Sequence, residues 1–143
     1  MPVSVYCETR WDKRLGSDQD SVFSITFDNG ISASITVSSR TEQIFDVLDV
    51  YGTNGRIRSE WPSENIEIQS SVLSDYHDVK RIVSESPDYM EMYKVQMKDW
   101  IGSMLEGSKV PIGTMDALKV YKVIDAAYKS ANLGKTINIT GLN

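Results

Sequence analysis

The stretch SVFSITFDNGISASITV, residues 21–37, decides the fold of this chain. On each side of the central Asp28-Asn29-Gly30, apolar and hydroxyl side chains alternate one by one. Successive side chains of a strand point to opposite faces, so this alternation gives each half one apolar face and one polar face. The stretch therefore predicts two strands joined by a tight turn.

The length of that turn sets which side chains meet across the hairpin. A two-residue loop at Asn29-Gly30 would set Phe27 opposite Ser32 and would place apolar against polar residues along the whole pair. Burial of one face therefore requires a three-residue loop, with Gly30 in the left-handed conformation. This loop sets apolar residues opposite each other: Phe27 with Ile31, Ile25 with Ala33, and Phe23 with Ile35.

The other face of the predicted hairpin carries only small hydroxyl side chains, and we call it the hydroxyl face. Its members are Ser24, Thr26, Ser32, Ser34 and Thr36. It has none of the charged residues that normally keep an exposed sheet from pairing with other chains. A flat, unguarded sheet face is usually covered, so we expect the hydroxyl face to be an interface.

The rest of the chain predicts further strands and then two helices. Strands are expected at residues 3–9, on both sides of the glycine pair in 51–57, at 66–72 and at 135–139. One helix begins at Ser86-Pro87-Asp88 and ends at Gly107, and the next runs from Thr114 to Gly134. This order indicates an α+β domain, with a mainly antiparallel, open-faced sheet and helices packed on one face.

Composition limits the class of protein. The 143 residues, 1–143, suit a single domain, and 15 Lys+Arg against 20 Asp+Glu give a formal charge of −5. That charge argues against a nucleic-acid binder and against a polybasic membrane-surface module. The lone Cys7 excludes a disulfide scaffold, no apolar run is long enough to span a bilayer, and no signal peptide is visible. We therefore expect a cytoplasmic protein.

The sequence contains no recognisable catalytic, nucleotide or metal motif. Gly52-Thr53-Asn54-Gly55 lies between predicted strands, whereas a phosphate-binding loop precedes a helix. His77, the only histidine, has no second histidine as a co-ligand and fits an exposed connection better than a metal site or a general base. The segment around Arg10 and Trp11 fits sugar or anion binding and a polar loop about equally well.

Four segments, in order, resemble the C-terminal domain of the Gfo/Idh/MocA oxidoreductases, the family of glucose-fructose oxidoreductase and inositol dehydrogenase. The resemblance covers about residues 20–140. The segments are DSVF (20–23) with FDNGISA (27–33), VYGTNGRI (50–57), QMKDWI (96–101), and the closing helix and strand at DALKV (116–120), IDAAYKSA (124–131) and GKTI (134–137).

The resemblance implies a two-domain oxidoreductase in which a Rossmann domain that binds NAD(P) precedes this α+β domain. The glycine-rich dinucleotide loop, the Glu-Lys-Pro segment with the catalytic lysine and the Asp-x-x-x-His pair are all missing from the 143 residues. The resemblance therefore assigns no catalytic residue, no metal and no cofactor to this chain. It implies NAD(P) for the intact enzyme, acting on CH–OH groups.

The resemblance also implies what this chain itself contributes. It would close one wall of a pocket for a small sugar or polyol, and we expect Arg10, Trp11 and Tyr128 to contact that substrate. The hydroxyl face would join copies of the chain into a homo-oligomer, with a dimer as the simplest case. The alternative is a stand-alone, non-catalytic dimeric binding or assembly module of the same fold.

Overall fold

The computed structural model describes residues 1–42, 44–62, 65–83 and 89–140. The chain divides into two units, the first formed by Met1–Thr41 with Gly102–Asn143 and the second by Glu42–Ile101. Each unit contains one four-stranded antiparallel sheet. The described residues also form two α-helices, so the chain has the predicted α+β class, and its described strands are distributed over two sheets.

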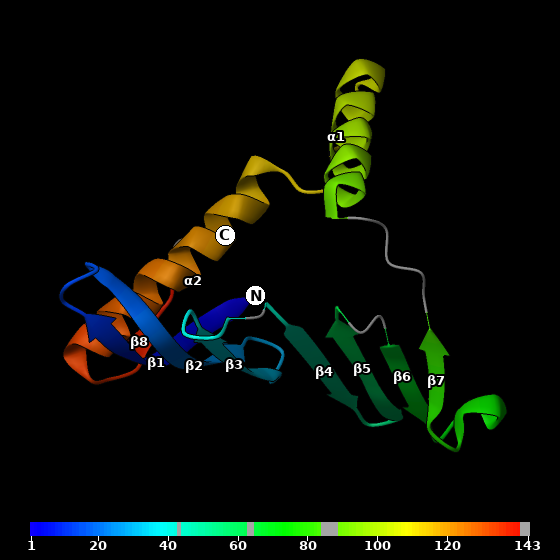
Figure 1. Ribbon diagram of the computed structural model, residues 1–143, viewed down its shortest axis with the longest axis horizontal. Coiled ribbons are helices and arrows are strands. Elements are labelled where there is room, and N and C mark those ends of the chain that lie inside the picture. The colour runs from blue at the N-terminus through cyan, green and yellow to red at the C-terminus, as the bar shows by residue number, and fades with distance from the viewer. Residues whose placement is uncertain (43, 63–64, 84–88, 141–143) are drawn as a thin grey trace. The chain divides into compact units, whose positions relative to one another are not determined.

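The sheet of the first unit has the strand order β3-β2-β1-β8 (Figure 1). The strands are β1 (Pro2–Asp12), β2 (Ser17–Phe27), β3 (Ser32–Ser38) and β8 (Ile137–Asn138). Because β8 pairs with β1, the last described strand of the chain lies beside its first. The predicted strands at the two ends of the sequence are therefore neighbours.

The hairpin between β2 and β3 has the predicted register. Phe23 lies opposite Ile35 and Ile25 opposite Ala33, and the amide of Phe27 donates to the carbonyl oxygen of Ile31 at 2.9 Å. Gly30 adopts a φ of +82°, which L side chains rarely tolerate. The three-residue turn and its requirement for glycine are confirmed.

Helix α2 (Thr114–Leu133) packs on β1 and β8 (Figure 1) and closes the core of the first unit. The buried apolar residues are Val5, Cys7, Ile25, Ala126 and Ala127. The two alanines let the helix approach the sheet closely, because their side chains are small. The helix ends as predicted at Gly134, whose φ is +62° and whose amide donates to the carbonyl oxygen of Ser130 at 2.8 Å.

Ser130 is fully buried and joins the end of α2 to the central strand. Its hydroxyl oxygen accepts the amide proton of Cys7 at 2.9 Å and donates to the carbonyl oxygen of Lys135 at 2.7 Å. One small side chain thus satisfies two backbone groups where the helix, β1 and the segment before β8 meet.

The sheet of the second unit is a meander with the order β4-β5-β6-β7. Its strands are β4 (Asp46–Gly52), β5 (Gly55–Trp61), β6 (Asn65–Ser70) and β7 (Lys80–Val83). The predicted reversal between β4 and β5 is confirmed. Gly55 has a φ of +151°, and a Cβ at this position would collide with the backbone carbonyl of Gln69, so this turn requires glycine.

The remaining elements are a short 3-10 helix, η1 (Ser74–Tyr76), and helix α1 (Tyr89–Glu106). Helix α1 ends at the predicted Gly107, whose φ is +66°, whereas its predicted start at Ser86-Pro87-Asp88 lies outside the described residues. Strand β7 was not predicted, since it is short and begins with two cations. Within the described segments, no helix is long and apolar enough to cross a membrane.

We expect Ser130→Ala to lower the free energy of unfolding by about 1–3 kcal/mol, because it leaves the buried amide of Cys7 and the partly buried carbonyl of Lys135 without this hydrogen-bond partner. Chemical denaturation followed by circular dichroism measures the loss. Ser34→Ala, which removes the same hydroxyl from an exposed strand position, is the matched control and should change the midpoint little. Equal midpoints for the two variants would contradict this role of Ser130.

Candidate functional site

An extra residue in β2 changes which side chains face α2 at one end of the first sheet. Arg10 pairs with Asp20, whereas the next residue, Trp11, pairs with Asp18. Gln19 therefore has no partner of its own on β1, which defines a β-bulge. Beyond the bulge the alternation of β2 is reversed, and Asp18 faces α2 instead of the open side.

Asp18 is the centre of a polar group between the sheet and α2, and we call this group the Asp18 cluster. The hydroxyl of Tyr128 on α2 donates to Asp18 Oδ1 at 3.0 Å. The hydroxyl of Ser21 donates to Asp18 Oδ2 at 3.2 Å, and Thr9 Oγ1 lies 2.7 Å from Ser21 Oγ. The cluster is thus a connected network of three hydroxyl groups and one carboxylate.

Two titratable groups near Asp18 have a raised pKa. The hydrogen bond to Asp18 raises the pKa of Tyr128 above its usual value near 10, with burial and the negative charge of Asp18 adding to the effect. Burial raises the pKa of the Cys7 thiol, and the charges of Asp18 and Glu8 raise it further. Neither group is therefore prepared to act as a base or nucleophile at neutral pH.

Two of the three predicted substrate contacts meet at this cluster. Trp11 shares the face of its strand partner Asp18 and remains 52% exposed, and the hydroxyl of Tyr128 is bound to the same Asp18. An exposed indole beside hydroxyl and carboxylate groups can stack on a sugar ring and exchange hydrogen bonds with its hydroxyls. The alternating pattern of the sequence could not identify Asp18 as a site residue, because only the bulge makes it face α2.

Arg10 lies on the opposite face of the sheet from Trp11. Its strand partner Asp20 accepts a hydrogen bond from the Ser38 hydroxyl at 2.7 Å and pairs with Arg40 at 3.3 Å. The Ser38 hydrogen bond, followed by Arg40 and Arg10, holds the pKa of Asp20 below its usual value. Arg10 therefore lies at the margin of the hydroxyl face and away from the other two predicted contacts.

The five members of the hydroxyl face lie together, and all are exposed. Ser24 is opposite Ser34, Thr26 is opposite Ser32, and Thr36 is opposite Val22. On β1, Tyr6 lies beside Ser24 and Glu8 beside Val22. The face is thus uncharged over β2 and β3, and charged residues begin only toward one end and over β1.

The other chemical candidates do not form sites in the described part of the chain. No three His, Cys, Asp or Glu side chains there are arranged to hold a metal ion. His77 follows η1, and its carbonyl oxygen accepts a hydrogen bond from the Gln69 amide at 3.5 Å. Gly52 and Gly55 close the β4–β5 turn, as expected for a hairpin rather than a phosphate loop.

Over residues 3–139 the chain matches the family described as "Oxidoreductase family, C-terminal alpha/beta domain" (GFO_IDH_MocA_C). The match covers nearly the whole chain, and both the α+β fold and the expected order of elements agree with it. The chain belongs to this family, the C-terminal domains of the Gfo/Idh/MocA oxidoreductases.

Known relatives are sugar dehydrogenases and other oxidoreductases. The chain is 23% identical over 138 residues to D-xylose 1-dehydrogenase (NADP(+)) 2 of Haloferax volcanii, covering 96% of this chain and 42% of that protein. Levoglucosan dehydrogenase, solved with NADH and levoglucosan, has a TM-score of 0.85 and 16% identity, covering 98% and 45% of the two chains. An Agrobacterium radiobacter oxidoreductase, solved with NAD+, L-tartaric acid and magnesium, has a TM-score of 0.79 and 19% sequence identity to this chain. The match covers 96% of this chain and 43% of that chain. The chain thus spans less than half the length of these relatives.

We expect Tyr128 to titrate above its usual pKa near 10, because its proton is held by Asp18. The ultraviolet difference between wild type and Tyr128→Phe isolates this phenol during an alkaline titration. Since the pKa is higher in the folded than in the unfolded chain, the associated stabilisation is complete below about pH 10 and is lost as the pH rises through the folded value. Asp18→Asn should lower the midpoint, and an unchanged midpoint would contradict the assignment.

Proposed function

We propose that this chain is the substrate-binding and oligomerisation domain of an NAD(P)-dependent sugar or polyol oxidoreductase and is not catalytic on its own. The observation that carries the proposal is the family match over residues 3–139, in a chain that covers only 42% of a curated dehydrogenase relative. In the intact enzyme a Rossmann domain would hold the nicotinamide for hydride exchange with a hydroxyl or carbonyl carbon of the substrate.

The start of helix α2 is a poor site for a dinucleotide, which supports placing the cofactor on another domain. A pyrophosphate binds at the free amides of a helix N-terminus after a glycine-rich turn. At the start of α2, the amide of Gly113 already donates to the Asp116 carboxylate at 3.1 Å, and this hydrogen bond lowers the pKa of Asp116. An ionised carboxylate at this position repels a second anion.

The substrate part of the proposal rests on Trp11 and the Asp18 cluster. Trp11 offers stacking and the cluster offers hydrogen bonding, but the phenol of Tyr128 keeps its proton at neutral pH. Such a wall binds and orients a polyhydroxylated substrate, while proton and hydride transfer occur elsewhere. Because Arg10 faces the other side of the sheet, we assign it to the margin of the hydroxyl face in this proposal.

The oligomerisation part rests on the hydroxyl face. Its exposed, uncharged surface over β2 and β3 lacks the charges that protect solvated sheet faces. Small hydroxyl side chains keep such a face flat, and two flat sheets pack about 10 Å apart. We therefore expect two copies of the chain to pack on each other through this face.

Lysines at Ser24 and Ser34, which lie opposite each other, should prevent this association, because each copy would place two positive charges in the interface. Sedimentation equilibrium should show a dimer for the wild-type chain and a monomer for the double variant Ser24→Lys/Ser34→Lys. The control variant is Leu15→Lys, at a site 67% exposed in the turn between β1 and β2. It adds a positive charge away from the hydroxyl face and should stay dimeric. A monomeric wild type at high concentration would refute the self-association.

A further inference from the structure

Asp18 differs from the other aspartates of the first unit, because no cation neutralises its charge. Ion pairs with a basic side chain or with the terminal amine hold the other five, which are Asp12, Asp20, Asp28, Asp116 and Asp125. Among residues 1–42, 44–62, 65–83 and 89–140, no cation pairs with Asp18, and the side chains that donate to it are neutral hydroxyl groups. The Asp18 cluster therefore has an uncompensated negative charge.

The basic residues next to Trp11 and Tyr128 in the sequence do not supply the missing cation. Arg10, which precedes Trp11, lies on the opposite face of the sheet. Lys129, which follows Tyr128, contacts Asp125 at 2.6 Å. The charge of Asp18 is thus left for a cation from solution, and the formal charge of −5 on the whole chain attracts such cations.

The cluster is open to a ligand. Asp18 is partly exposed, Tyr128 is 39% exposed and Trp11 is 52% exposed. An ionised carboxylate has about four acceptor positions on its two oxygens. The hydroxyls of Tyr128 and Ser21 occupy one position on each oxygen. Asp18 can therefore accept further hydrogen bonds without losing those that it already has.

The surroundings of Asp18 favour a cation over a neutral or an anionic ligand. Trp11 is the strand partner of Asp18 and lies on the same face of the sheet. An ammonium group is attracted to the face of an aromatic ring, most strongly to indole, and forms charge-assisted hydrogen bonds with a carboxylate. A hydroxyl group gains only weaker hydrogen bonds, and a ligand carboxylate or phosphate would meet a like charge.

An ammonium group suits the site better than a metal ion. No three His, Cys, Asp or Glu side chains in the described segments are arranged to hold a metal. A calcium ion, for example, requires six to eight oxygen ligands, and carboxylates supply much of its binding. An ammonium group has three donors and needs only one carboxylate together with neutral acceptors such as the oxygen of Tyr128.

We propose that Trp11 and the Asp18 cluster bind the protonated amine of an amino sugar or of an aminated polyol. Asp18 accepts hydrogen bonds from the ammonium group, Trp11 packs against it, and the oxygen of Tyr128 accepts a hydrogen bond from an adjacent hydroxyl of the ligand. The inference rests on the substrate-binding role proposed above for this wall, and it narrows the substrate class to polyols that carry a positive charge.

Three probes that differ at one terminal carbon test the preference for a cation. D-glucamine ends in a primary amine, which is protonated at neutral pH as the lysine side chain is. D-sorbitol has a hydroxyl group at this carbon, and D-gluconate has a carboxylate. The shift of the Trp11 indole N–H signal in nuclear magnetic resonance spectra, assigned by its loss in Trp11→Phe, gives the affinity of each. Glucamine should bind at least about tenfold more tightly than sorbitol, and gluconate most weakly.

Two variants assign the preference to one carboxylate. Asp18→Asn keeps an acceptor for Tyr128 and removes the charge, so glucamine should then bind within a few-fold of sorbitol. Asp28→Asn, which removes the same charge in the turn at the other end of β2, is the matched control and should keep the preference. Circular dichroism shows that each variant is folded, and the comparison of the three probes on the wild-type chain requires no variant.

Each outcome decides between the two levels of the proposal. If the wild type binds sorbitol or gluconate as tightly as glucamine, or if Asp18→Asn keeps the preference, the amine site is overturned while the polyol-binding wall remains. If none of the three probes shifts the Trp11 signal, the substrate-binding role of this wall is overturned as well. Preference for glucamine in the wild type and its loss in Asp18→Asn alone would support the amine site.

Discussion

The first unit depends on the burial of one face of a three-stranded antiparallel segment against a single helix. Val5, Cys7 and Ile25 meet Ala126 and Ala127 only while β1, β2 and β3 keep one register. A slip of one residue would exchange these apolar residues for hydroxyl groups. The same register that forms the core therefore also gathers the serines and threonines on the opposite face, so core and proposed interface are two results of one alternation.

Features set by neighbouring residues could be predicted from the sequence. The three-residue turn at Gly30 follows from the alternating pattern on both sides of it, and the helix ends at Gly107 and Gly134 follow from the loss of the apolar period beside a glycine. The membership of Ser24 and Thr36 in one face follows for the same reason. In each case the deciding residues lie within a few positions of the feature.

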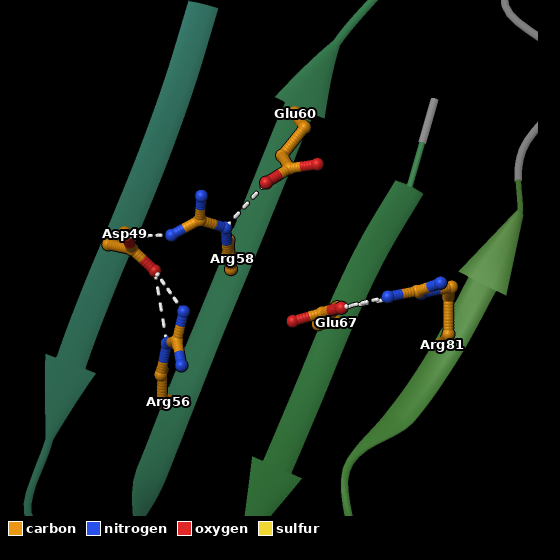
Figure 2. Close-up of polar contacts among 6 residues, drawn as sticks. All are labelled: Asp49, Arg56, Arg58, Glu60, Glu67 and Arg81. Atoms are coloured by element: carbon orange, nitrogen blue, oxygen red, sulfur yellow. Dashed lines mark hydrogen bonds and ion pairs between the residues drawn. The ribbon is translucent and has the colours of Figure 1, made fainter. Parts of the chain in front are cut away.

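Features set by pairing between distant segments could not be predicted. The bulge at Gln19 turns Asp18 toward Tyr128, 110 residues further along the chain. Arg10 and Trp11 face opposite sides of the sheet because β1 continues through both of them, beyond the predicted end of this strand at residue 9. A row of charged residues across the second sheet needs three registers at once, and its last member lies on the unpredicted strand β7 (Figure 2). Its members are Asp49, Arg58, Glu67 and Arg81. No local pattern contains this information.

The proposal assigns to this chain surfaces for a substrate and for copies of itself, and it assigns the dinucleotide to another domain. The central claim is that cofactor binding belongs to the rest of a longer oxidoreductase, and titration calorimetry of this chain with NADH and NADPH tests it most directly. We predict no measurable binding of either nucleotide at concentrations that saturate a micromolar site. A one-to-one complex with a micromolar dissociation constant would contradict the claim.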